Sequence, residues 1–98
     1  MFTSGEYKGA KIMLKEGDEV IMGKDSKISS IVFSDASISR KHCSIRMVGG
    51  EFILNDYSTN GVYSSLTETK LKLAGASYTL HYHEAITLSK TNNTFYCE

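Results

Sequence analysis

Residues 44–54 read Ser-Ile-Arg-Met-Val-Gly-Gly-Glu-Phe-Ile-Leu, two short apolar runs separated by a pair of glycines. A two-residue hairpin turn requires positive φ angles at its central positions, and glycine adopts them without steric cost. Gly49-Gly50 therefore predicts a tight β-hairpin between strands at residues 43–48 and 51–55. This hairpin indicates that the chain around it is β-structure.

The rest of the chain follows the same rhythm on both sides of the hairpin. Gly, Ser, Asn and Asp separate short apolar segments, and the sequence contains no proline and no low-complexity tract. This pattern is typical of a β-sandwich, so we expect an all-β fold. Residues 65–68 match a helix capping box, but Leu71 and Leu73 then alternate with lysines at period two, which favours a strand there. The expected strands are residues 10–14, 19–22, 31–33, 43–48, 51–55, 70–73, 77–80, 85–88 and 94–97.

Length and charge limit the classes of function. The 98 residues suit a single domain spanning 1–98 with one core, and eleven Lys and Arg balance eleven Asp and Glu. Without an excess of positive charge, binding to nucleic acid or to an anionic membrane is not expected. The apolar run at residues 11–15 is too short for a signal peptide or a membrane span, so we expect a cytoplasmic domain that inserts in no membrane. A neutral module is often one part of a larger protein, and that alternative stays open.

Three polar clusters each adjoin an expected strand. They are Gly23-Lys24, Ser39-Arg40-Lys41-His42 and Ser58-Thr59-Asn60-Gly61. In order and spacing they resemble the forkhead-associated (FHA) family, whose pattern is Gly-Arg, then Ser-Arg-x-His, then Ser-x-Asn-Gly. The resemblance is carried by residues 23–61, which also hold the Asp35 and Asp56 positions of the family.

The resemblance implies an eleven-stranded β-sandwich with binding loops at one end, which recognises phosphothreonine in a partner protein. Ser/Thr kinases would supply that partner, and the domain would mediate phosphorylation-dependent protein–protein interaction in signalling or complex assembly. No catalytic residue, metal or cofactor is implied. The binding residues carried over are Lys24, Ser39, Arg40, Thr59 and Asn60, and the residues that support the site are Gly23, His42, Ser58 and Gly61.

The chemistry of these side chains suits a phosphate dianion. The Arg40 guanidinium can donate two parallel hydrogen bonds, the Ser39 hydroxyl can donate another, and Lys24 supplies a point charge. The Asn60 amide can hold the backbone of an extended peptide. One position departs from the family, because Lys24 stands where arginine is usual and cannot make the planar bidentate contact.

Two other classes of function compete with this hypothesis. A degenerate FHA scaffold would bind its partner independently of phosphate, in keeping with Lys24. An enzyme would need a nucleophile such as Ser39 beside His42, or a metal site at His81, His83 and Glu84, if both histidines share one face of a strand. We expect a structural His42, an exposed strand end at His81 and His83, and buried free thiols at the two cysteines, Cys43 and Cys97.

Overall fold

The computed structural model describes residues 1–66, 70–71 and 77–97. Its described part contains ten strands, where the family resemblance implied eleven, and it contains no helix long and apolar enough to cross a membrane. The strands are β1 (Phe2–Ser4), β2 (Glu19–Gly23), β3 (Ile31–Val32), β4 (Cys43–Val48), β5 (Glu51–Asp56), β6 (Val62–Ser64), β7 (Lys70–Leu71), β8 (Ser77–Thr79), β9 (Ala85–Leu88) and β10 (Thr94–Tyr96).

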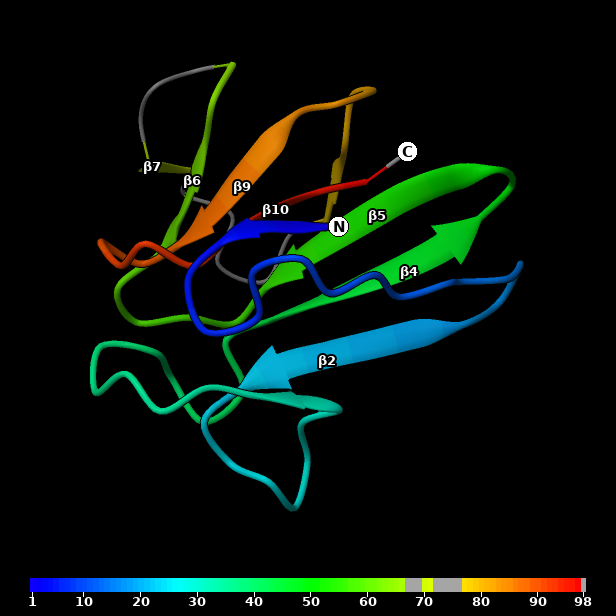
Figure 1. The fold of residues 1–98 in the computed structure, drawn as a ribbon. Helices are drawn as coiled ribbons and strands as arrows, with labels where there is room; N and C mark the ends of the chain where they lie inside the picture. The colour runs from blue at the N-terminus through cyan, green and yellow to red at the C-terminus, as the bar shows by residue number, and fades with distance from the viewer. Residues whose placement is uncertain (67–69, 72–76, 98) are drawn as a thin grey trace.

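The strands form two sheets, so the predicted all-β sandwich is confirmed (Figure 1). One sheet has the order β1-β10-β9-β6-β7 and the other has the order β3-β2-β4-β5-β8. Pairing is antiparallel except between β2 and β3, which run parallel. Each sheet therefore contains strands from distant parts of the chain, and the loops between them gather at the two ends of the sandwich.

The central hairpin forms as predicted. β4 and β5 pair from Cys43 opposite Asp56 to Val48 opposite Glu51, and the turn residues Gly49 and Gly50 have φ angles of 62° and 78°. The hairpin turn lies at one end of the sandwich, and the loops that carry the three polar clusters lie at the other (Figure 1).

The core fills the space between the sheets. Ile45 of β4 and Leu54 of β5 are fully buried, and they form one core cluster with Ile86 and Leu88 from β9. Burying one such side chain contributes about 1.5–3 kcal/mol to stability. The N-terminal Phe2 closes this core with its ring 5.4 Å from Phe95, measured between ring centroids.

One predicted strand is wrong and two strands were missed. Residues 10–14 form irregular chain, because the edge position beside β10 is taken by β1, which the sequence analysis did not predict. Ala10 and Leu14 pack against the core, but Ile12 and Met13 are 44% and 88% exposed, so the segment lies on the core without joining a sheet. β6 was also missed, since only the apolar pair Val62-Tyr63 signals it. Two predictions extend beyond the described residues. Residues 67–68 of the capping box and residues 72–73 of the strand predicted at 70–73 lie outside them.

The histidine pair does not lie on a strand end. His81 to Glu84 form a tight turn in which the Glu84 N–H donates to the His81 carbonyl at 3.1 Å, and His83 has a φ of 60°. The premise that both rings share one strand face is therefore wrong, although both histidines are exposed as expected. No cluster of three metal-binding side chains occurs within the described residues.

Both cysteines are free thiols, Cys43 buried and Cys97 half-buried. Burial raises the pKa of Cys97 to about 11 and raises that of Cys43 as well. Both side chains therefore stay protonated at neutral pH and act as apolar packing groups.

Candidate functional site

The first two polar clusters are joined through their backbones. The Lys24 N–H donates to the Ser39 carbonyl at 2.9 Å, and the Asp25 N–H donates to the Arg40 carbonyl at 3.1 Å. Lys24 and Arg40 therefore stand on adjacent stretches of chain although they are distant in sequence. Both side chains are exposed, and neither forms an ion pair within the described part of the chain.

Gly23 is required because the chain passes very close to Arg40. A Cβ atom at this position would lie 2.1 Å from the Arg40 carbonyl oxygen and 2.8 Å from the Ser29 hydroxyl. A real Cβ cannot approach that closely, so any side chain here would push the arginine backbone away.

His42 joins the second cluster to the third. Its buried ring accepts a hydrogen bond from the Ser39 N–H at Nδ1, at 3.0 Å, and Nε2 lies 2.9 Å from the Gly61 carbonyl oxygen. The backbone N–H at Nδ1 assigns the ring proton to Nε2, which donates to Gly61. Burial lowers the pKa of His42, against smaller raising effects of the Gly61 hydrogen bond and the Asp56 charge. Since both ring nitrogens are occupied by backbone, His42 is not placed to act as a base for Ser39.

Hydrogen bonds to the side chains of Asp56 and Ser58 fix the loop of the third cluster. The buried carboxylate of Asp56 accepts hydrogen bonds from the Ser58 N–H, at 2.8 Å, and from the Ser58 hydroxyl. The Ser58 oxygen in turn accepts the Gly61 N–H at 2.8 Å, and Gly61 has a φ of 90°. The loop is therefore held from its base, and the side chains of Thr59 and Asn60 remain exposed at its tip.

The tip of this loop contacts the second cluster directly. The Thr59 N–H donates to Ser39 Oγ at 3.0 Å, and Asn60 Nδ2 donates to the Ser37 carbonyl at 2.8 Å. All five predicted binding residues therefore lie on loops that are bonded to one another at the same end of the sandwich (Figure 1).

The structure gives a role to Asp35, which lies between the first two polar clusters. Asp35 accepts hydrogen bonds from the Ser37 side chain at 2.7 Å and its N–H at 2.8 Å, and so fixes the carbonyl that Asn60 contacts. These bonds, with a smaller effect of nearby Lys24, lower the pKa of Asp35. The family resemblance had named the Asp35 position but not this role.

Lys41, which lies between Arg40 and His42, makes a side-chain contact of its own. Its Nζ atom lies over the exposed ring of Tyr57, 4.1 Å from the ring centroid. This cation–π contact links the residue after Arg40 to the residue before Ser58. No sequence pattern indicates it, because the two residues meet only in the fold.

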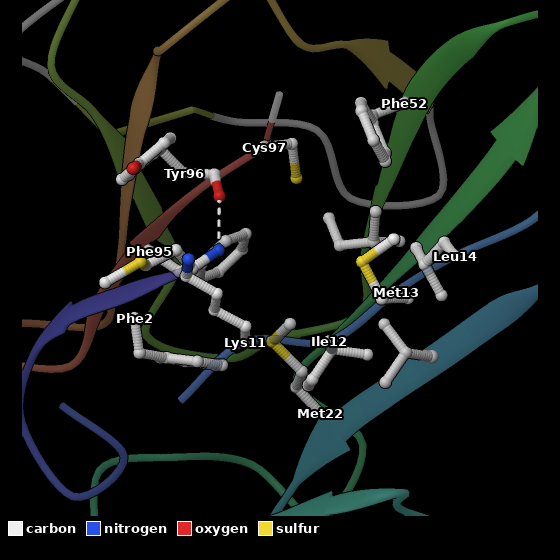
Figure 2. Close-up of a pocket in the computed structure, with 13 residues that line it drawn as sticks. Phe2, Lys11, Ile12, Met13, Leu14, Met22, Phe52, Phe95, Tyr96 and Cys97 are labelled. Carbon is white, nitrogen blue, oxygen red and sulfur yellow. Dashed lines mark hydrogen bonds between the residues drawn. The ribbon is translucent and has the colours of Figure 1, made fainter. Parts of the chain in front are cut away.

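An apolar cavity of about 130 Å³ lies elsewhere, between the two sheets (Figure 2). The irregular segment 11–14 covers it, and Phe52, Phe95 and Cys97 line it. The Met1 amino group donates to the Tyr96 carbonyl at its edge, at 2.8 Å. None of the predicted binding residues lines this cavity, so the polar loop surface is a separate site.

Comparisons with known proteins agree with the fold and the motifs. A family model described as the FHA domain matches residues 20–89. The FHA domain of CT664 from Chlamydia trachomatis is 31% identical, with a TM-score of 0.70, and the match covers 89% of this chain and 81% of that one. No curated protein sequence matches the chain.

Several similar structures hold a bound partner, and two of them match this chain along most of both chains. The MEK1 FHA domain in complex with a HOP1 phosphothreonine peptide is 25% identical, with a TM-score of 0.75 and coverage of 92% of this chain and 91% of that one. The FhaA FHA domain complexed with the intracellular domain of Rv3910 is 26% identical, with a TM-score of 0.66 and coverage of 86% and 85%. The resemblance inferred from three motifs is confirmed, and the match extends beyond residues 23–61 on both sides.

Proposed function

Because the chain belongs to the FHA domain family, we propose that it is a non-catalytic module that binds phosphothreonine in a partner protein. One observation carries the proposal: Lys24, Ser39, Arg40, Thr59 and Asn60 stand on three loops that hydrogen bonds tie together. Relatives that bind phosphothreonine peptides support it.

The phosphate would bind between Lys24, Ser39 and Arg40. Ser39 Oγ already accepts the Thr59 N–H, so its own proton is left to donate to a phosphate oxygen. Arg40 would donate a charge-assisted pair of hydrogen bonds. Since the backbones of these residues are fixed before binding, little conformational entropy would be lost when the phosphate arrives.

Asn60 would hold the peptide backbone next to the phosphothreonine. Its Nδ2 donates to the Ser37 carbonyl, which fixes the plane of the amide and points its remaining groups away from that carbonyl. A threonine methyl buried beside it would contribute about 1 kcal/mol, so phosphothreonine would bind about fivefold more tightly than phosphoserine.

The function we propose is phosphorylation-dependent assembly: a Ser/Thr kinase modifies the partner, and this domain then binds it. The replacement of the usual arginine by Lys24 favours a second candidate, a scaffold that binds its partner without phosphate. A lysine ammonium cannot make the planar bidentate contact with phosphate that an arginine makes.

A calorimetric titration separates the two candidates. Degenerate peptides with phosphothreonine, phosphoserine or threonine at one fixed position are titrated into the folded domain. The matched control for Arg40→Ala is Arg46→Ala, at an exposed position on β4 outside the loops. Binding of the phosphothreonine form that Arg40→Ala abolishes and Arg46→Ala retains would support the phosphothreonine reader. Binding of the threonine form, unchanged by Arg40→Ala, would favour the scaffold.

A further inference from the structure

An open pocket of about 450 Å³ adjoins the phosphopeptide loops. Ser37, Asn60, Tyr63, Ser89 and Lys90 line it. Ser37 and Asn60 are the pair whose hydrogen bond joins two of these loops, and Ser89 and Lys90 follow β9. A peptide held by Asn60 would therefore pass beside the pocket.

The turn that carries Lys90 is bonded to the proposed site. The Ser89 N–H donates to the Gly61 carbonyl at 2.8 Å, and this is the same oxygen that His42 Nε2 contacts. Ser89 is buried and has a φ of 54°, a left-handed conformation that serine adopts only where its surroundings enforce it. Residues 89–93 thus form a fourth loop of the same end of the sandwich (Figure 1).

The backbone on both sides of Lys90 is also fixed. Thr91 donates to the Leu88 carbonyl through its hydroxyl, at 2.7 Å, and through its N–H, at 3.3 Å. The buried Asn93 donates from its own N–H to the Thr91 hydroxyl at 3.0 Å. Lys90 itself is exposed, so its ammonium group extends from a fixed point beside Asn60.

The lining of this pocket is positively charged. Lys90 is its charged member, and the other lining residues within the described part of the chain are two serines, an asparagine and a tyrosine. A cation among hydroxyl and amide groups suits an anionic side chain, because Lys90 supplies charge and the neighbours supply hydrogen bonds.

We propose that this domain selects phosphothreonine peptides that carry an acidic side chain at one flanking position, and that Lys90 is the residue that determines this preference. The inference rests on the proposed function and adds the class of peptide. Aspartate, glutamate and a second phosphorylated residue share the required negative charge.

The test is a scan of peptides with fixed phosphothreonine and alanine elsewhere. Aspartate, lysine and phosphoserine are placed in turn at each flanking position, and affinities are measured by fluorescence anisotropy for the unsubstituted domain, Lys90→Glu and Lys15→Glu. Lys15 is an exposed lysine near the opposite end of the sandwich, so Lys15→Glu controls for the change in net charge. Thermal unfolding checks that each variant is folded.

At one position we expect aspartate to bind about threefold to fivefold more tightly than alanine, as for an exposed ion pair, and lysine more weakly. Lys90→Glu should invert this order and Lys15→Glu should leave it unchanged. Phosphoserine binding no better than alanine would assign the pocket to carboxylates, and phosphoserine exceeding aspartate would assign it to a second phosphate, both within the proposal. A flat scan, or a preference for aspartate that survives Lys90→Glu, would overturn the inference while phosphothreonine binding stands. Failure of every phosphopeptide to bind would overturn the proposed function and the inference together.

Discussion

Replacing His42 with alanine should destabilise the domain and loosen the site. The ring is buried and makes two hydrogen bonds to backbone, to the Ser39 N–H and to the Gly61 carbonyl. After truncation the Gly61 carbonyl keeps the Ser89 N–H, at 2.8 Å, so it stays satisfied. The Ser39 N–H loses its only partner in the described structure.

The size of the loss follows from these contacts. An orphaned N–H costs about 2 kcal/mol, and the lost packing of the ring adds about 1 kcal/mol. A total of about 3 kcal/mol would lower the melting temperature by about 15 °C in a domain of this size. The affinity for a phosphothreonine peptide should also fall about tenfold, because Ser39 and the loop at Gly61 are no longer held together by hydrogen bonds to one ring.

Urea unfolding followed by circular dichroism measures the stability, and calorimetry well below the melting temperature measures the affinity. His42→Asn is the matched variant, because its Oδ1 atom stands near the place of Nδ1 and can still accept the Ser39 N–H. It should recover about half of the loss. A loss below about 1 kcal/mol for His42→Ala, or an asparagine variant no more stable than the alanine variant, would refute this reasoning.

Three further perturbations test other parts of the account. Gly23→Ala should abolish binding or prevent folding, because its Cβ would lie 2.1 Å from the Arg40 carbonyl oxygen. The control Gly50→Val, where a Cβ meets nothing within 4 Å but φ is 78°, should lower stability by about 1–2 kcal/mol and leave binding unchanged. Unfolding and calorimetry on both variants check this, and a Gly23→Ala domain that binds normally would contradict it. Stability should fall as pH drops below about 6.5, by at most about 1.4 kcal/mol per pH unit. The reason is that burial lowers the pKa of His42 in the folded state, so the unfolded chain takes up the proton first. Urea midpoints between pH 8 and 5 measure this loss, and an equal slope in His42→Asn would exclude His42 as its cause. Glu84→Gln should lower the free energy of unfolding by about 2 kcal/mol, because this buried carboxylate accepts hydrogen bonds from the His81 N–H, the Tyr78 hydroxyl and the Ser64 hydroxyl. Unchanged urea unfolding would count against that role.

The sequence was sufficient to predict those parts of the sheets whose conformation depends on neighbouring residues alone. Gly49-Gly50 predicted the central hairpin because positive φ is a property of the residues themselves. The strand predicted at residues 10–14 was wrong, because an apolar run predicts burial but not which strand occupies the edge of a sheet. β1 occupies that edge, and its Phe2 side chain is buried in the core. Edge order is decided by packing between distant segments, which no local pattern encodes.

The candidate site divides in the same way. Its motif residues could be named from the family resemblance, and the structure places them on adjoining loops. The contact of Lys41 with Tyr57 and the bond from Ser89 to Gly61 could not be predicted, since each joins segments that meet only after the sheets have formed. The histidine pair was misplaced because Glu84 turns its side chain inward and bends the chain at His81.

The most direct test of the central claim is an NMR titration of the isotope-labelled domain. The probe is a peptide with one phosphothreonine and alanine elsewhere, compared with its unphosphorylated form. We expect the largest amide shifts at Ser39, Arg40 and Thr59, with a matching shift of the Arg40 side chain and no response to the unphosphorylated peptide. Shifts that gather instead around the apolar cavity at Met13 and Phe52, or that are equal for both peptides, would contradict a phosphothreonine site on these loops.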